Sequence, residues 1–190
     1  MKLEVVHFPW GYWRRVRSEG AMSGRDTPRI EAPLAGCCHC GNVELALETN
    51  MRPEELSLRA DTCSFCRKHG ARTTSDPSGR VVITVHRPEQ LLRYRFGLRT
   101  ADFLVCGHCG IYVAAVIAEG SSSYATVNVN TLDAVDRFTR PLMPVTYEGE
   151  SAPERSARRK ARWTPALIVE EGRQPSEPDS CGSGGRPPRP

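Results

Sequence analysis

Ala35-Gly-Cys-Cys-His-Cys-Gly41 sets two thiols, Cys38 and Cys40, between two glycines. Two more thiol pairs follow at Cys63-x-x-Cys66 and Cys106-x-x-Cys109. At these spacings both sulfurs of a pair can point the same way from a tight turn and bind one metal ion. Three such pairs within about 70 residues predict zinc binding.

Glycines flank the first and the last of these thiol pairs. Gly36 and Gly41 surround the first pair, and Gly107 and Gly110 accompany the last. Glycine adopts positive φ without steric cost, so we expect these positions to bring backbone amides close to the sulfurs.

The six paired thiols can be divided between metal ions in more than one way. Four thiolates around one zinc make a closed, structural site, whereas a catalytic zinc keeps three protein ligands and an open position. The pair left over then needs a third ligand, and Asp61, two residues before Cys63, is the first candidate. The other candidates are Cys37, His39, His69 and His108. Asp61 has an alternative role as the cap of a turn.

The composition is that of one ordinary domain with extensions. The chain has 190 residues, of which 39% are hydrophobic, and its Gly 16 and Pro 15 favour strands and loops over long helices. Leu3–Trp13 is interrupted by polar residues and proline and lacks the apolar core of a secretory signal. There is no apolar run of about 18 residues, so we expect no membrane span. A cytoplasmic chain keeps thiols reduced, which favours metal sites over disulfides.

Charge is distributed unevenly along the chain. Residues 31–150 carry 12 Lys/Arg and 14 Asp/Glu, whereas both ends are basic. A mildly acidic central block argues against a nucleic-acid partner for the folded part.

We expect three segments. Residues 1–30 are a flexible extension, and Met22 is an alternative start. Residues 31–150 form the zinc-binding domain. Residues 151–190 are a tail that begins with the basic segment Arg155–Arg162, interpreted as a solvated helix, with an anionic partner as the alternative. The Gly/Pro-rich remainder, with Cys181, is expected to be disordered.

Within the central block, short alternating or β-branched apolar segments predict strands. The predicted strand segments are Val43–Leu47, the end of Pro53–Ala60, Val81–Val85, Leu92–Phe96, Phe103–Val105, Ile111–Ala118, Tyr124–Asn130 and Pro144–Tyr147, and Leu132–Phe138 is a predicted helical turn. The thiol pairs fall in the turns between these strands, so the fold class is all-β.

The motifs resemble those of the glutathione-dependent formaldehyde-activating enzyme family, which also includes centromere protein V. The matching segments are Gly36-x-Cys38-His39-Cys40-Gly41, Cys63-Ser-Phe-Cys-Arg-Lys68, Tyr94-Arg-Phe-Gly97 and Cys106-x-x-Cys109-Gly110. The resemblance covers about 35–150 and implies an all-β zinc-binding "tent" of small antiparallel sheets.

The resemblance also implies a division of the ligands. Cys38, Cys40, Cys106 and Cys109 would hold a structural zinc, and Cys63 and Cys66 a second, catalytic zinc. The family has a third cysteine where this chain has Asp61, so Asp61 is predicted to complete the second, catalytic set with Cys63 and Cys66.

The implied activity is that of a carbon–sulfur lyase. It would act on the adduct of an aldehyde with glutathione or another small thiol, such as S-hydroxymethylglutathione. Glutathione carries two carboxylates, and Arg67 is the predicted cation for them, ahead of Lys68, Arg95 and Arg99. Because Asp61 replaces a cysteine, the alternative is a zinc-stabilised binding module with a degenerate catalytic site.

Overall fold

The computed structural model describes residues 4–7, 13–16 and 32–172. Two short strands, β1 (Glu4–His7) and β2 (Trp13–Val16), pair with each other in a sheet of their own. The expectations for Met22, Cys181 and the Gly/Pro-rich end fall outside the described residues. Among those described, no helix is long and apolar enough to cross a membrane.

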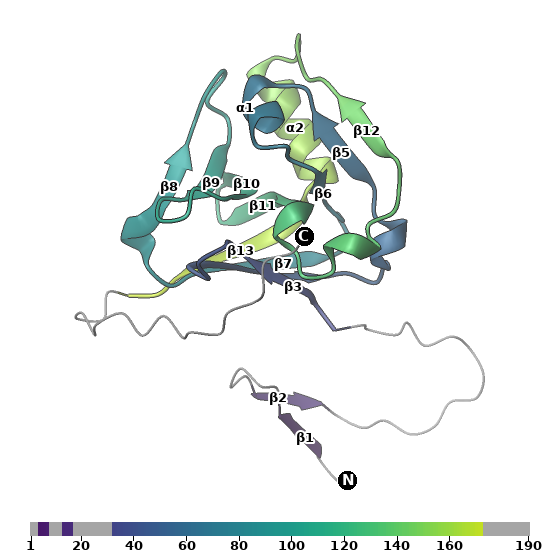
Figure 1. Ribbon diagram of the computed structural model, residues 1–190, viewed down its shortest axis with the longest axis vertical. Helices are drawn as coiled ribbons and strands as arrows, with labels where there is room; N and C mark the ends of the chain where they lie inside the picture. Colours follow the sequence, from purple (N-terminus) through teal and green to yellow (C-terminus); the bar gives the residue numbers. More distant parts are fainter. Residues whose placement is uncertain (1–3, 8–12, 17–31, 173–190) are drawn as a thin grey trace, which may run out of the picture.

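The remaining strands are joined by hydrogen bonds into one branched sheet, which Figure 1 shows as a tent. These strands are β3 (Leu34–Cys37), β4 (Val43–Glu48), β5 (Leu58–Asp61), β6 (Thr73–Thr74), β7 (Arg80–Val85), β8 (Leu91–Tyr94), β9 (Asp102–Cys106), β10 (Tyr112–Glu119), β11 (Ser122–Asn128), β12 (Leu142–Val145) and β13 (Thr164–Glu170). The helices are α1 (Ser64–Lys68) and α2 (Ala152–Arg162), with short 3-10 turns at Pro53–Glu55, Pro88–Gln90, Val129–Thr131 and Val135–Arg137. The predicted all-β class is confirmed.

The pairing is mostly antiparallel, as expected. Two pairs, β12 with β5 and β13 with β7, run parallel instead. A parallel pair needs a long crossover between its strands. Here several strands of the same sheet lie in the chain between the two members of each parallel pair. The strands therefore form one continuous sheet, where several small sheets were expected.

The expected domain boundary at residue 150 is too early. In the sheet, β13 lies between β11 and β7, antiparallel to the first and parallel to the second. It therefore joins the half of the sheet that contains β5, β6 and β11 to the half that contains β3, β4 and β7. This strand was not predicted from the sequence because it does not alternate between apolar and polar residues: Pro165 interrupts it, and the apolar Leu167 and Val169 are exposed.

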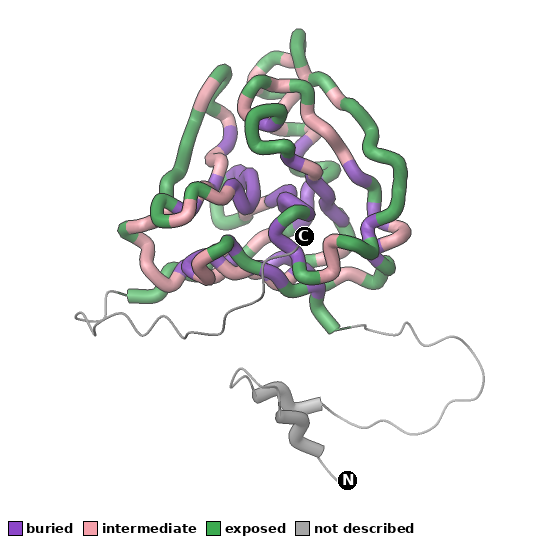
Figure 2. Tube along the Cα trace, viewed as in Figure 1, coloured by how far each residue is buried: buried purple, intermediate pink, exposed green. Residues whose placement is uncertain are grey.

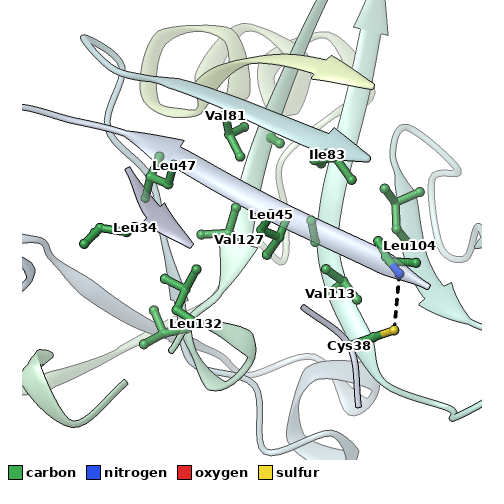
Figure 3. Packing of buried hydrophobic residues seen from close by; sticks show 14 of the residues in the cluster. Leu34, Cys38, Leu45, Leu47, Val81, Ile83, Leu104, Val113, Val127 and Leu132 are labelled. Carbon is green, nitrogen blue, oxygen red and sulfur yellow. Dashed lines mark hydrogen bonds between the residues drawn. The ribbon is translucent and has the colours of Figure 1, made fainter. Parts of the chain in front are cut away.

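The main core lies between the two halves of this sheet (Figures 2 and 3). Strand β4 turns Val43, Leu45 and Leu47 inward and leaves the residues between them part-exposed, which is the period-two pattern predicted for this strand. Strand β10 is buried from Tyr112 to Ile117, as expected of its unbroken apolar run. Each fully buried leucine or valine contributes about 1.5–3 kcal/mol.

We predict that the segment after residue 150 is required for folding. A chain that ends at Gly172 should unfold in one cooperative thermal transition, as followed by circular dichroism. A chain that ends at Glu150 lacks the strand between β11 and β7 and buried Trp163, whose side chain alone is worth about 3–5 kcal/mol. It should show no cooperative transition; an unchanged melting temperature would contradict the assignment of β13 to the core of the fold.

A histidine between two glutamates links three strands at one end of the sheet. Nδ1 of His86, just after β7, lies 2.9 Å from Glu171 Oε2, and its Nε2 lies 3.2 Å from Glu44 Oε1. Partial burial lowers the pKa of His86, but the hydrogen bonds to the two carboxylates outweigh it and raise the pKa above its ordinary value.

The stabilisation from His86 should depend on pH. A raised folded pKa means that this stability is fully present below the unfolded value of about 6.5 and is lost as pH rises through the folded value. His86→Gln should therefore lower the melting temperature more at about pH 5.5 than at about pH 8.5. Equal effects at both pH values would show that the charged pairing contributes nothing.

Candidate functional site

The structure brings the paired thiols together as two separate clusters. In the first, the four sulfur atoms all lie within 4.8 Å of one another; they belong to Cys38, Cys40, Cys106 and Cys109. In the second, ligand atoms of Asp61, Cys63 and Cys66 meet the same limit. These are the two sets that the family resemblance implied, and both have the donor chemistry of a zinc site. Cys37, His39, His69 and His108 are exposed and belong to neither cluster.

The four-cysteine cluster joins two hairpin turns that are far apart in the chain. Cys38 and Cys40 lie in the turn from β3 to β4, and Cys106 and Cys109 lie in the turn from β9 to β10. The sulfurs of Cys40 and Cys106 are 3.5 Å apart, and those of Cys38 and Cys40 are 3.6 Å apart. Cys38 and Cys106 are fully buried, so this cluster is closed to solvent on its inner side.

Backbone amides point at these sulfurs in the same way in both turns. Val43 N donates to Cys38 Sγ at 3.3 Å, which Figure 3 shows at the edge of the core. Cys40 accepts from the amide of Asn42, and Cys109 accepts from the amide of Ile111. The glycines between, Gly41 and Gly110, have φ of 79° and 75°, as the sequence predicted.

The other two flanking glycines serve a different purpose. Gly36 and Gly107 do not have positive φ. A Cβ at Gly36 would lie 2.1 Å from the carbonyl oxygen of Thr131, and one at Gly107 would lie 2.9 Å from that of Gln90. These positions are glycine because neighbouring backbone packs directly against them.

The thiols of this cluster differ in how readily they ionise. Burial raises the pKa of Cys38 well above its ordinary value, and burial also raises that of Cys40. At Cys109 burial acts in the same direction, but amide donors and neighbouring thiols overcome it and lower the pKa to about 6. The cluster thus holds one thiol, Cys109, that ionises readily and two, Cys38 and Cys40, whose ionisation a bound cation would favour, which suits a metal site.

The three-donor cluster is built where β5 ends and α1 begins. Asp61 is the last residue of β5, and its Oδ1 accepts a hydrogen bond from Cys63 N at 3.0 Å. Cys63 is the N-cap of α1, and its sulfur accepts from Cys66 N at 3.4 Å. Asp61 therefore caps the turn, which is one of its two predicted roles. Its carboxylate also lies within 4.8 Å of both sulfurs, and its role as a metal ligand stays a prediction.

The local charges disfavour ionisation of Cys66 in the absence of a cation. Burial raises the pKa of Cys66, and the nearby Cys63 and Asp61 raise it further. The pKa of the fully buried Tyr112 is likewise raised well above its ordinary value by burial and by these three groups. A divalent cation would remove this repulsion by binding the three donors together.

An aromatic cluster fixes α1 against the neighbouring strands. The ring of Phe65, between Cys63 and Cys66, lies 4.9 Å from that of Phe103 on β9 and 5.1 Å from that of Tyr112 on β10. Tyr94 and Phe96 stack on it at 5.6 and 5.5 Å. Aromatic pairs at these separations are each worth about 0.5–1.5 kcal/mol beyond burial, so the cysteine turn is held firmly.

A pocket opens beside the three-donor cluster. Its volume is about 100 Å³, and Asp61 and Cys63 are part of its wall. The remaining wall is formed by Thr62, Phe96, Gly97, Thr100, Ala101, Phe103, Thr146, Tyr147, Glu148, Arg155 and Arg159. No residue of the four-cysteine cluster lines this pocket. The four-cysteine cluster therefore lies apart from this pocket, and the three-donor cluster faces a space that a small molecule could enter.

The cations of the pocket are not those expected from the sequence. Arg67, Lys68, Arg95 and Arg99 are exposed and do not line it. Arg155 and Arg159 do, and both lie on α2, which was interpreted as a solvated helix. The signal available in the sequence was the spacing of Arg155, Arg159 and Trp163, which places a buried aromatic ring on the same helical face as two arginines.

We predict that the four-cysteine cluster is a structural zinc site. Cys38→Ser should remove about one zinc ion per chain and abolish the cooperative thermal transition, because a closed four-thiolate site contributes directly to folding. Cys37→Ser, a change at the exposed neighbouring residue, is the matched control and should alter neither. Elemental analysis and thermal unfolding would measure the two effects; equal zinc content in both variants would contradict the assignment.

Comparison with known proteins gives a family and a related structure. A family model described as glutathione-dependent formaldehyde-activating enzyme matches residues 33–148. A solved structure of a protein from Rhodobacter sphaeroides is 34% identical, over 58% of this chain and 99% of that chain, with a TM-score of 0.43. No curated protein matches. The matched residues contain both clusters and end before α2 and β13.

Proposed function

The chain belongs to the glutathione-dependent formaldehyde-activating enzyme family, and on that premise we propose that it is a zinc-dependent carbon–sulfur lyase. It joins the thiol of a small molecule such as glutathione to an aldehyde, or cleaves the resulting adduct. In the joining direction the sulfur bonds to the aldehyde carbon and the thiol proton ends on the new hydroxyl group, so no oxidant or reductant is needed.

One observation carries this proposal: the three-donor cluster forms part of the wall of a pocket, whereas the four-cysteine cluster does not. Closed four-thiolate sites are structural, and sites with three protein ligands leave one position for substrate. Asp61, Cys63 and Cys66 are the residues that would hold the second zinc. When bound, that zinc supplies a position that takes a substrate thiolate or polarises an aldehyde oxygen.

The protein's own groups prepare the site for this chemistry. The hydrogen bond from Cys63 N fixes the Asp61 carboxylate beside the two sulfurs. Phe96 and Phe103 provide an apolar wall that limits water around the reacting carbon. Tyr112, whose raised pKa keeps it neutral, adds no negative charge beneath the cluster.

The metal content of three proteins tests the assignment. The parent should hold about two zinc ions per chain, and Asp61→Ala and Cys63→Ser should each hold about one, because a pair of donors retains zinc poorly. Both variants should lose the acceleration of S-hydroxymethyl adduct formation, which isotope-exchange NMR can follow with formaldehyde and glutathione or another small thiol. Ser64→Ala, an exposed change in the same turn, is the control and should leave both readouts unchanged.

Asp61→Cys refines the test. Thiolate is a softer donor than carboxylate, so this variant should hold the second zinc more tightly in a chelator competition. Unchanged affinity would remove Asp61 from the ligand set. The lyase proposal would be contradicted if the parent held a single zinc, kept it in the variants at residues 61 and 63, and showed no turnover. That result would favour a zinc-stabilised binding module.

A further inference from the structure

Helix α2 is held firmly over the pocket by contacts along its length. Its N-terminus has a capping box formed by Ser151 and Glu154. Arg158 binds both carboxylate oxygens of Glu150, at 2.7 and 2.9 Å, and stacks 3.4 Å from the centre of the Tyr147 ring. Ser156 donates to Glu119 at 2.6 Å. The arginines that α2 presents to the pocket are therefore fixed in place.

Arg159 is a buried cation with an unused donor. Its side chain is 7% exposed, and its Nη1 donates to the carbonyl and the hydroxyl oxygens of Thr100 at 3.0 and 2.7 Å. Its guanidinium carbon lies over the Trp163 ring, 5.0 Å from the ring centre, but its Nε has no hydrogen-bond partner, and among the described residues no carboxylate forms an ion pair with it. A buried charge normally has a partner, so this guanidinium is a candidate for a ligand's anionic group.

Arg155 lines the pocket one helical turn before Arg159. One of its terminal nitrogens donates to the carbonyl oxygen of Tyr147, and its buried Nε has no hydrogen bond. The nearest carboxylate oxygen, on Glu150, is 3.7 Å from that Nε. Glu150 is already bound to Arg158, so it neutralises Arg155 only in part.

The ligand chemistry follows from what these two arginines adjoin. Guanidinium groups bind carboxylates through paired hydrogen bonds. The same pocket wall contains Asp61 and Cys63 of the cluster that would take a thiol. A ligand that satisfies both ends carries a thiol and a carboxylate.

The volume of the pocket limits the size of the thiol-carboxylate ligand that it can enclose. Its volume of about 100 Å³ is well below the roughly 300–1,000 Å³ of sites that enclose whole drug-sized ligands. A tripeptide such as glutathione would leave most of its atoms outside, whereas a mercapto acid of two or three carbons fits within it.

We propose that the preferred substrate is a short mercapto acid whose carboxylate is bound by Arg155 and Arg159 while its sulfur faces Asp61 and Cys63. The thiol end of this assignment rests on the proposed function. The carboxylate end rests on the two arginines of α2, a helix that lies after the residues matched by the family model.

A binding titration that needs no turnover tests this proposal. The cobalt-substituted protein is titrated with 3-mercaptopropionate and with uncharged 3-mercapto-1-propanol, and binding is reported by the increase in thiolate-to-cobalt absorption above the band that the protein's own cysteines give. The parent should bind the acid about 10–100-fold more tightly than the alcohol, since a charged hydrogen-bond pair is worth about 1.5–3 kcal/mol. Glutathione should bind more weakly than 3-mercaptopropionate.

Variants on one helix identify the groups responsible. Arg159→Met and Arg155→Gln should each lower affinity for the acid at least several-fold and leave the affinity for the alcohol unchanged. Arg162→Gln removes the same charge from an exposed position of α2 and should keep the full preference for the acid. Because Arg159 is buried, its variant is compared only if its thermal transition is retained; Arg155→Gln, at a less buried position, provides the decision otherwise.

The outcomes separate this proposal from the proposed function. An absorption band that forms equally with acid and alcohol, or a preference that all three arginine variants keep, overturns the carboxylate site and leaves the lyase proposal standing. The opposite outcome has two parts: calorimetry detects binding of 3-mercaptopropionate that depends on Arg155 and Arg159, and no thiol changes the thiolate-to-cobalt absorption. That result would support the carboxylate site and remove the thiol from the metal. A preference lost in Arg67→Ala alone would return the role to that exposed residue and overturn the assignment to α2.

Discussion

The contact between the sulfurs of Cys40 and Cys106, 3.5 Å apart and 66 positions apart in sequence, constrains the whole fold. It brings the turn between β3 and β4 onto the turn between β9 and β10, and so closes one side of the tent over the main core. Four clustered thiols attract one another only weakly, and burial raises the pKa of two of them, Cys38 and Cys40. The geometry is therefore compatible with a metal site, and a bound cation would offset the loop-closure entropy of bringing the two turns together.

The second cluster depends on the first through the strands between them. Strands β9 and β10 leave the four-cysteine turn and carry Phe103 and Tyr112, whose rings hold Phe65 of α1. Phe65 lies between Cys63 and Cys66, so the position of these two sulfurs is set by packing against strands that the first cluster anchors. The first cluster thus lies where two turns of the scaffold meet, and the second packs against that scaffold and faces a pocket.

Much of this arrangement could be predicted from the sequence because it depends on local patterns. The thiol spacings indicated three metal-binding pairs, and the family resemblance implied how these pairs divide into two clusters. The alternation of Val43, Leu45 and Leu47 indicated a half-buried strand. The position of Asp61 beside Cys63 could also be read, since two residues of separation in a turn keep side chains close. The expectation of positive φ at Gly36 and Gly107 was wrong. These residues are glycine because the backbone of Thr131 and of Gln90 packs against them, and such a long-range contact leaves no pattern in the neighbouring sequence.

What the sequence concealed is the part of the chain after residue 150. Arginine side chains on helices are usually exposed, so the sequence predicts that Arg155 and Arg159 face solvent. The buried Trp163 on the same face is the one neighbour that indicates a packed position for them. The insertion of β13 between β11 and β7 is a long-range pairing that no local periodicity reveals. Its consequence is functional as well as structural. Because α2 leads directly into a strand that joins the two halves of the sheet, the arginine side of the pocket is held by the same hydrogen bonds that hold the sheet together. The residues matched by the family model include Asp61 and Cys63 of the pocket wall, and helix α2, which follows them, contributes Arg155 and Arg159 to the same wall. The selectivity proposed for the pocket therefore depends on a helix that lies outside the matched residues.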